Sequence, residues 1–421
     1  MTTKNNIPAG YKDSAVGIIP QEWEVKYLGD LLSRLANGLT YDVSITSGYP
    51  ISRIETISSG EINYLKVGYI DNVSGCESYK MQKGDILYSH INSLAHVGKV
   101  AYYDGKQELY HGMNLLLMRA NDKVDSNYLY AYLLTSQAKH IAQVIAKPAV
   151  NQASISTSDI RKIKLAIPPL AEQRKIAEIL GVWDEAIEKQ SRLIEKLELR
   201  KRALMQRLLT GRTRLPGFTA PWQKVKLGEI GKRIIRRNEE NNQNVMTISA
   251  QRGFVRQTDF FNKNVASENL DNYYLVYRDE FCYNKSYSNG YPMGAIKRLK
   301  EADKAVVTTL YICFCLNCSV KVDIDFFEQY CENGGFNQNL MKVANEGGRA
   351  HGLLNVTPSD FFGLQLLLPY LPEQKAIAEV LTSADNEIAT HRKKLDALRL
   401  QKRGLMQQLL TGKTRVKIYK L

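Results

Sequence analysis

Two long runs of the chain carry apolar residues at alternating spacings of three and four positions. The first run follows Pro169 and ends at Gly211, and the second follows Pro372 and ends at Gly412. This period is typical of a coiled-coil seam, because it keeps the apolar side chains on one narrow stripe of a helix. A proline near the start and a glycine at the end favour a helix with these bounds. We therefore predict two helices of about 40 residues, each roughly 60 Å long.

The predicted seam is almost the same in the two runs. Its residues are Ile176, Leu180, Ile187, Ile194, Leu197 and Leu204 in the first run, and Ile377, Leu381, Ile388, Leu395, Leu398 and Leu405 in the second. Gln190, Lys201, His391 and Lys402 fall on the same stripe, where polar residues cost stability and help to fix the register of pairing. A narrow stripe does not stabilise a lone helix, so we expect the two helices to pack on each other. The alternative is that each helix only braces its own domain.

The two runs align with each other without a gap. Glu172 matches Glu373 near the helix starts, and Arg214 matches Arg415 just beyond the helix ends. A repeat of this length indicates two half-molecules in tandem. The predicted fold class is α+β, with two globular domains and two long helices that form an antiparallel coiled coil about an approximate two-fold axis. The predicted regions are a first globular domain at 1–168, a long helix at 169–214, a second globular domain at 215–369 and a second long helix at 370–421.

Each half opens on a tryptophan and continues through short strand-like runs. Trp23 and Trp222 each closely follow a proline, and we expect both to be buried anchors of their domains. The strand-like runs are 61–67, 83–89 and 98–103 in the first half, and 279–284 and 294–297 in the second. An amphipathic helix follows in each half, beginning near Ser126 and near Asp325. The common order indicates one structural frame that is used twice.

Polar loops with unlike residues occupy equivalent places in the two halves. They contain Ser89, His90, Asn92, Asn151 and Gln152 in the first half, and Asn284, Lys285, Ser286, Tyr287, Asn289, Arg349 and His351 in the second. Amide, hydroxyl and cationic side chains of these kinds bind the phosphates and base edges of DNA. The alternative for any single one of them is an ordinary polar loop residue. A shared frame with unlike loops predicts two binding sites of different specificity.

The charge balance favours a polyanionic partner. The chain of 421 residues has 57 Lys and Arg against 43 Asp and Glu, a formal net charge of +14. No apolar run is long enough to span a membrane, and the first residues lack the apolar core of a signal peptide. We therefore expect a cytoplasmic protein that does not cross a membrane.

Motifs for catalysis or metal binding are not evident. The run Thr-Gly-Lys-Thr near the C-terminus resembles the end of a phosphate-binding loop, but Gln407 stands where a glycine is needed and a helix precedes it. Cys313, Cys315 and Cys318 suggest a metal site, but no histidine lies nearby, and their segment is typical of a buried strand. We predict no catalytic residues and no metal site, and we expect a binding and scaffolding protein.

The sequence resembles the specificity subunits of type I restriction–modification enzymes. The resemblance rests on Pro-Pro-Leu-Ala-Glu-Gln-Arg at the start of the first long helix, and on Leu-Met-Gln and Leu-Leu-Thr-Gly at 204–211 and again at 405–412. Gly-Ile-Ile-Pro-Gln-Glu-Trp, ending at Trp23, is also typical. The resemblance covers nearly the whole chain, although Pro-Tyr-Leu-Pro at 369–372 replaces Pro-Pro-Leu-Ala at the second helix start.

The resemblance implies a non-catalytic subunit that binds double-stranded DNA. In that family, each of two target-recognition domains reads one half of a split target, and the paired helices set the gap between the halves. The implied partners are two DNA methyltransferase subunits and the restriction (translocase) subunits. The implied cofactors, S-adenosylmethionine, ATP and Mg²⁺, are expected on those partners and not on this chain.

Two alternatives remain open at this level. One is a self-sufficient DNA-modifying enzyme with an unfamiliar active site. The other is a protein that uses its positive charge to bind RNA or a membrane surface. The DNA sequence that is recognised, and the length of the gap, do not follow from the amino-acid sequence.

Overall fold

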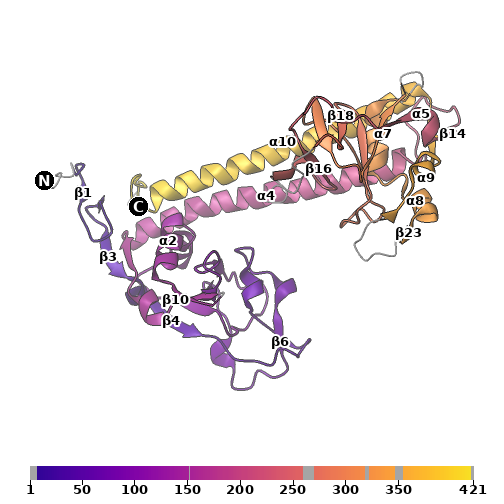
Figure 1. Cartoon of the computed structure of the whole chain (residues 1–421). Coiled ribbons are helices and arrows are strands. Elements are labelled where there is room, and N and C mark those ends of the chain that lie inside the picture. Colours follow the sequence, from indigo (N-terminus) through magenta and orange to yellow (C-terminus); the bar gives the residue numbers. More distant parts are fainter. Residues whose placement is uncertain (1–6, 151, 259–269, 318–321, 347–353, 419–421) are drawn as a thin grey trace. The chain divides into compact units, whose positions relative to one another are not determined.

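A computed structural model gives the structure of the chain, and it describes residues 7–150, 152–258, 270–317, 322–346 and 354–418 (Figure 1). The chain divides into two compact units. One unit holds residues 1–190 with 394–421, and the other holds residues 191–393. The divisions fall within the two long helices, so each unit contains one globular domain together with part of both helices.

The first unit is built on an antiparallel sheet with the strand order β4-β10-β7-β9. Its strands are β1 (Tyr11–Lys12), β2 (Ile19–Pro20), β3 (Glu24–Tyr27), β4 (Leu32–Asn37), β5 (Tyr49–Ile51), β6 (Gly68–Ile70), β7 (Ile86–Tyr88), β8 (Ile91–Asn92), β9 (Val100–Tyr102), β10 (Leu116–Ala120), β11 (Lys147–Ala149), β12 (Gln152–Ser154) and β13 (Lys164–Ile167). Its helices are η1 (Leu28–Leu31), η2 (Ile54–Ile57), η3 (Tyr64–Lys66), η4 (Glu77–Tyr79), α1 (Ser126–Leu133), α2 (Ser136–Ile145) and α3 (Thr157–Arg161). A smaller sheet has the order β11-β12-β8, and β3 pairs with β13 directly before the long helix α4 (Leu170–Leu208).

The second unit repeats this plan with the sheet order β15-β22-β19-β20. Its strands are β14 (Gln223–Lys226), β15 (Gly231–Ile234), β16 (Met246–Ser249), β17 (Gly253–Arg256), β18 (Tyr274–Tyr277), β19 (Phe281–Asn284), β20 (Ala295–Arg298), β21 (Lys304–Val307), β22 (Ile312–Leu316), β23 (Asn345–Glu346), β24 (Leu354–Asn355) and β25 (Gln365–Leu368). Its helices are α5 (Leu227–Ile230), α7 (Ile324–Glu332), α8 (Asn337–Val343) and α9 (Pro358–Phe362). β14 pairs with β25 directly before the second long helix, α10 (Leu371–Leu409), as β3 pairs with β13 before α4.

The long helices α4 and α10 span 39 residues each and run antiparallel within each unit. In the first unit Lys402 of α10 pairs with Asp184 of α4, and in the second unit Lys201 of α4 pairs with Asp385 of α10 at 2.6 Å. The predicted helices, their ends and their mutual packing are confirmed. Gly211 and Gly412 end them with φ of 69° and 71°, a left-handed conformation that glycine adopts at little cost.

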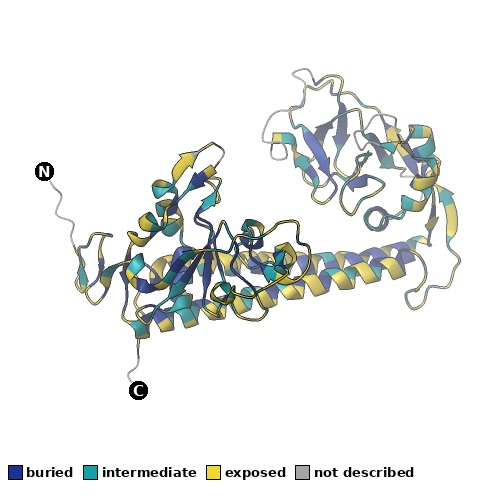
Figure 2. Cartoon of the chain, turned by 90° about the horizontal axis from the view of Figure 1, so that it is seen from below, coloured by how far each residue is buried: buried dark blue, intermediate teal, exposed yellow. Residues whose placement is uncertain are grey.

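The predicted seam residues are buried or half-buried throughout both helices (Figure 2). Of the polar stripe residues, Gln190 is buried, and both lysines hold a carboxylate of the facing helix. The lysines therefore contribute to register, because a helix shifted along its partner would leave these half-buried charges unpaired.

Each globular core also takes residues from both helices. The first core contains Trp23 together with Ile176 and Leu180 from the start of α4, and Leu409 and Leu410 from the end of α10. The second core takes Ile377 and Leu381 from the start of α10, with Met205, Leu208 and Leu209 from the end of α4. The helices therefore pair with each other and also brace the domains, so the alternative that each helix only braces its own domain is wrong.

Most predicted strands are confirmed, and one is wrong. β7, β9 and β19 lie within the predicted runs and β20 extends one residue beyond its run, but residues 61–67 contain the 3-10 helix η3 in place of a strand. The Asn63 side chain accepts a hydrogen bond from the Leu65 backbone N–H at 2.9 Å, which favours a helical turn over an extended chain. The two amphipathic helices are present, with Asp125 and Asp323 as their N-caps.

The cysteine-rich segment forms a buried strand, as predicted. Cys313 on β22 lies opposite Cys282 on β19, and both are fully buried. Cys318 lies outside the described residues. Within the described ranges, no group of three or more His, Cys, Asp or Glu side chains is arranged to hold a metal ion, and no helix there is long and apolar enough to cross a membrane.

Candidate nucleic-acid interface

The structure brings together the two polar loops that the sequence singles out in the first domain. The chain leaves β7 and forms β8, which pairs with β12 so that Asn92 lies opposite Ala153. The backbone N–H of Ile155 donates to the His90 carbonyl oxygen at 2.9 Å. We call residues 89–93 together with the β11–β12 hairpin the first polar edge. Gln152 is exposed on this edge and Asn92 is half-buried, while Asn151 lies outside the described residues.

Two predicted contact residues of this edge are buried. Ser89 is 1% exposed and His90 is 7% exposed, so neither side chain faces solvent and direct contact with DNA is not supported for them. These side chains are buried because the pairing of β7 with the segment of β9 continues past the end of β7. There the Ser89 N–H donates to the Lys99 carbonyl oxygen at 2.8 Å. The Ser89 hydroxyl instead accepts a hydrogen bond from Asn92 Nδ2 at 3.1 Å and so orients that amide. Burial also lowers the pKa of His90.

The second domain uses the same arrangement with different side chains. The loop after β19 lies against β24, since the Leu354 N–H donates to the Lys285 carbonyl oxygen at 3.0 Å. We call residues 284–289 together with β23–β24 the second polar edge. Lys285 and Ser286 on it are half-buried, whereas Tyr287 and Asn289 are exposed. Arg349 and His351 lie outside the described residues.

Asn284 has a structural role on this edge. Its Nδ2 donates to the Ile248 carbonyl oxygen at 3.1 Å, and its Oδ1 accepts from the Ser286 N–H at 3.0 Å. Both ends of the amide are therefore occupied inside the domain, and it holds the first turn of the loop in place. A direct base contact would compete with both hydrogen bonds, so the exposed Tyr287 and Asn289 are better placed to contact a ligand.

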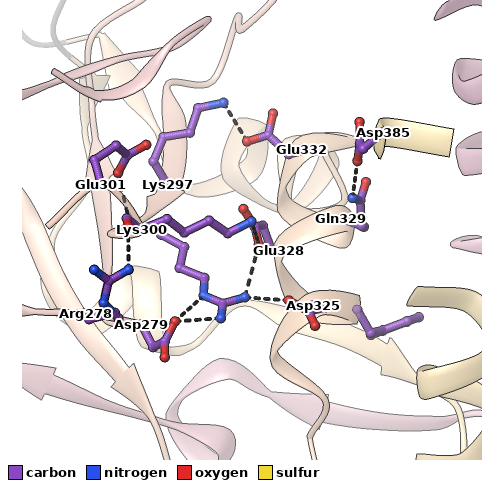
Figure 3. Close-up of polar contacts among 12 residues, drawn as sticks. Arg278, Asp279, Lys297, Lys300, Glu301, Asp325, Glu328, Gln329, Glu332 and Asp385 are labelled. Carbon is purple, nitrogen blue, oxygen red and sulfur yellow. Dashed lines mark hydrogen bonds and ion pairs between the residues drawn. The ribbon is translucent and has the colours of Figure 1, made fainter. Parts of the chain in front are cut away.

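Ion pairs that sequence reasoning missed fasten the strand behind this loop to α7. Arg298 of β20 pairs with Asp279 and with two carboxylates of α7, Asp325 and Glu328, and Figure 3 labels these three acidic residues. Lys297 pairs with Glu332 at 2.5 Å. The signal was present in the sequence, because Asp325, Glu328 and Glu332 are spaced three and four apart and so share one helix face.

The same helix connects the loop to the long helices. The hydroxyl of Tyr291, just beyond the second polar edge, donates to Glu332 at 2.9 Å, and burial first, then the Glu332 charge, raise the pKa of Tyr291. One turn earlier, Gln329 Nε2 donates to Asp385 of α10 at 2.7 Å (Figure 3). Asp385 is the carboxylate that also receives Lys201. A chain of polar contacts therefore extends from the loop through α7 to both long helices.

The glutamates at the helix starts form two clusters that we call clamps. In the first clamp, Glu172 is 1% exposed and accepts from Trp23 Nε1 at 3.2 Å. Arg415, which follows the end of α10, binds the same carboxylate with Nε at 2.7 Å and Nη2 at 2.9 Å. The third nitrogen, Nη1, donates to Glu22 at 2.7 Å. The hydrogen bonds to Glu172 and then to Glu22 raise the pKa of Arg415 against the opposing effect of burial, so the guanidinium group stays charged.

The second clamp repeats this geometry with the roles of the repeats exchanged. Glu373 is 1% exposed and accepts from Trp222 Nε1 at 3.2 Å. Arg214, which follows the end of α4, binds it with Nε at 2.5 Å and Nη2 at 2.6 Å. Each clamp therefore joins a domain and its own helix to the end of the other helix. These contacts join residues far apart in sequence, so no local pattern predicted them.

The glutamines next to these glutamates complete the junctions. Gln173 donates from Nε2 to the Pro168 carbonyl oxygen at 2.9 Å, and its Oε1 accepts from the Asp125 N–H at 2.8 Å. Gln374 makes the same two contacts with Pro369 and Asp323, at 2.9 and 2.8 Å. Asp125 and Asp323 are the N-caps of α1 and α7. The Glu-Gln pair therefore fixes each long helix to a neighbouring helix of its own domain.

Comparisons with known proteins point to the same family that the sequence resembles. Residues 20–199 match the family model described as the type I restriction modification DNA specificity domain. The putative type I restriction enzyme MjaX specificity subunit of Methanocaldococcus jannaschii is 34% identical over 440 positions, which cover 97% of each chain. The MjaVIII specificity subunit of that organism is 22% identical and covers 95% of this chain and 94% of the relative. A crystal structure of a type I restriction–modification S subunit from M. genitalium shares the fold, with a TM-score of 0.54 and 15% identity over 97% of this chain and 98% of the other.

Proposed function

The chain belongs to the family of type I restriction–modification specificity subunits, and from this premise we propose that it is the non-catalytic subunit that reads a split DNA target. Sequence-specific recognition of DNA within a multi-subunit complex is the function that its relatives support. The relatives and the solved structure give no support to the alternative of a self-sufficient DNA-modifying enzyme.

We assign one half of the target to each polar edge. The observation that carries this assignment is the common frame, in which the loop after β7 or β19 is hydrogen-bonded to the segment that leads into the long helix. The side chains on the two frames differ, with Asn92 and Gln152 on one edge and Tyr287 and Asn289 on the other. Side chains of these types form hydrogen bonds and apolar contacts with base edges, so unlike edges would read unlike sequences.

The remaining chemistry is assigned to partner subunits. We propose that two methyltransferase subunits bind the chain and supply S-adenosylmethionine, and that restriction subunits bring ATP and Mg²⁺. The net charge of +14 suits a subunit whose own task is to hold a polyanion. Work of this kind on the cell's DNA places the protein in the cytoplasm.

Co-expression tests the proposal. The chain and its methyltransferase partners would be produced in a host that lacks DNA methylation, and methylated positions would be mapped over the whole genome. We expect methylation only when all subunits are present, at one split sequence with a fixed gap. Methylation or cleavage of DNA by the purified chain alone would contradict the non-catalytic role, and methylation at a continuous sequence would contradict the assignment of half-targets.

A further inference from the structure

The two clamps lie at the junctions between the globular domains and the long helices. Glu172 is in the first turn of α4, Trp23 is at the start of the first domain, and Arg415 follows the end of α10. Glu373, Trp222 and Arg214 take the same places in the second unit. Each clamp thus ties three segments, and it adds a polar contact at the end of the other long helix, whose contacts with the core are apolar.

Directional contacts set these junctions apart from the rest of their surroundings. Apolar packing is non-directional, so it holds a domain against the helices without selecting one angle. A guanidinium group that binds a carboxylate through two parallel hydrogen bonds is planar and selects one orientation. The indole N–H adds a third fixed point, and the carboxylate that receives all three contacts is almost fully buried.

The turn at the end of α10 directs the chain towards the position of Arg415. Gly412 adopts a φ of 71°, and a Cβ atom there would lie 2.5 Å from Cγ of Pro20. The Tyr11 hydroxyl donates to the Gly412 carbonyl oxygen at 2.8 Å. The chain therefore turns closely against the start of the first domain before it reaches Arg415.

We propose that the two clamps are positioning elements, which fix the angle of each recognition domain on the helix pair and thereby the gap length that the protein accepts. This inference rests on the proposed function. The size of the effect follows from geometry. A tilt of about 10° moves an atom about 20 Å from the junction by about 3.5 Å, which is roughly the rise of one base pair. A loosened clamp therefore makes neighbouring gap lengths acceptable.

The chain offers a matched control inside the first domain. Arg119 binds Asp85 through Nε at 2.7 Å and Nη2 at 2.8 Å, and Asp85 is 1% exposed. This pair has the same chemistry as the Arg415–Glu172 pair but joins β10 to the start of β7 within the domain. Loss of the Arg119 pair would weaken the domain without freeing its angle on the helices.

The experiment uses the full complex with its methyltransferase partners. Targets that carry both native half-sites, with the native gap or a gap one base pair shorter or longer, would be methylated by the wild-type complex and by complexes with R415Q, R214Q and R119Q. We expect the ratio of methylation rates, altered gap over native gap, to rise at least about tenfold for R415Q and R214Q. We expect R119Q to keep the wild-type ratio, and all complexes to keep the native half-site sequences.

The conservative variant R415K is included in case R415Q fails to fold or assemble. It keeps the charge but not the paired hydrogen bonds, so its gap ratio should lie between those of the wild type and R415Q; if R415Q does not assemble, R415K decides alone. Clamp variants that lose activity equally on every gap would overturn the inference, as would a ratio that R119Q raises as much as they do. A wild-type complex that methylates no split target would instead overturn the proposed function.

Discussion

A fragment of residues 1–216 is expected to form a symmetric dimer that rebuilds the helix pairing of the whole chain. Within the intact chain each helix of one repeat meets the helix of the other, and the contacts are equivalent in the two directions. Lys201 pairs with Asp385, which aligns with Asp184, so in the fragment Lys201 would face Asp184 of the second copy. Two Lys201 side chains therefore do not oppose each other, although this lysine lies on the seam.

The strength of the clamp determines how much the R214Q substitution should weaken the dimer. In the dimer, Arg214 of each copy would take the place of Arg415 and bind Glu172 of the other copy, whose carboxylate is 1% exposed. Removal of one partner of a buried ion pair costs about 3–5 kcal/mol. The arginine side chains are 26% and 35% exposed in the two clamps, so solvent screening reduces this to about 1.5–3 kcal/mol for each clamp. Each dimer has two clamps, so R214Q should raise the dimer dissociation constant by about 10²–10⁴-fold.

Light scattering and sedimentation over a dilution series measure this constant directly. The fragment extends to residue 216 so that Arg214 is not the terminal residue, and R212Q, at an exposed position two residues before it, serves as the control. The wild-type and R212Q fragments should dimerise alike, and R214Q should dissociate at much higher concentration. A fragment that stays monomeric at all concentrations, or an R214Q dimer as tight as the wild type, would refute the equivalence of the two clamps.

Other expected outcomes concern stability. G181A and G404A should each stabilise the chain by about 0.5–1 kcal/mol, because both glycines lie inside long helices with open space around an added Cβ; G412A should destabilise it by about 1–3 kcal/mol, since alanine is strained at a φ of 71°. Urea unfolding checks all three, and a destabilising G404A would count against the helix assignment. Burial lowers the pKa of His111 to about 4 in the folded chain. Between pH 6.5 and 4, the His111 imidazole is therefore protonated in the unfolded chain but neutral in the folded chain. Stability should therefore be intact above pH 6.5 and fall by about 2–3 kcal/mol on acidification towards pH 4. Comparison of wild type with H111Q over this range isolates the effect, and equal pH slopes would contradict it.

Periodicity predicts the parts of this fold that depend on local pattern. The spacing of apolar residues gives the two helices, and Gly211 and Gly412 give their ends, because seam burial and helix termination act within a few residues. The same kind of reasoning fails at residues 61–67, where Asn63 forms a turn within a run that alternates like a strand. It also does not reveal that Ser89 and His90 are buried, because this depends on backbone pairing between Ser89 and Lys99.

Contacts between distant residues carry the rest of the candidate site. Glu172 and Arg415 each look like ordinary helix-end charges in the sequence, and only the antiparallel pairing of the helices brings them together. The cations of β20 and the acidic face of α7 were visible separately, but their meeting depends on how α7 packs on the sheet. The repeat itself was the one sequence feature that pointed to these junctions, because Glu172 and Arg214 both recur in it.

The proposed function requires that the two half-targets are read independently, which the exchange of one loop at a time would test. Residues 86–96 would be replaced by the equivalent segment of a relative with a different specificity, and a second variant would carry a replacement of residues 282–292. Genome-wide methylation would then be mapped for each complex. Each exchange is expected to change one half of the target and to leave the other half and the gap unaltered. A change in both halves from a single exchange, or no change in either half, would contradict independent reading.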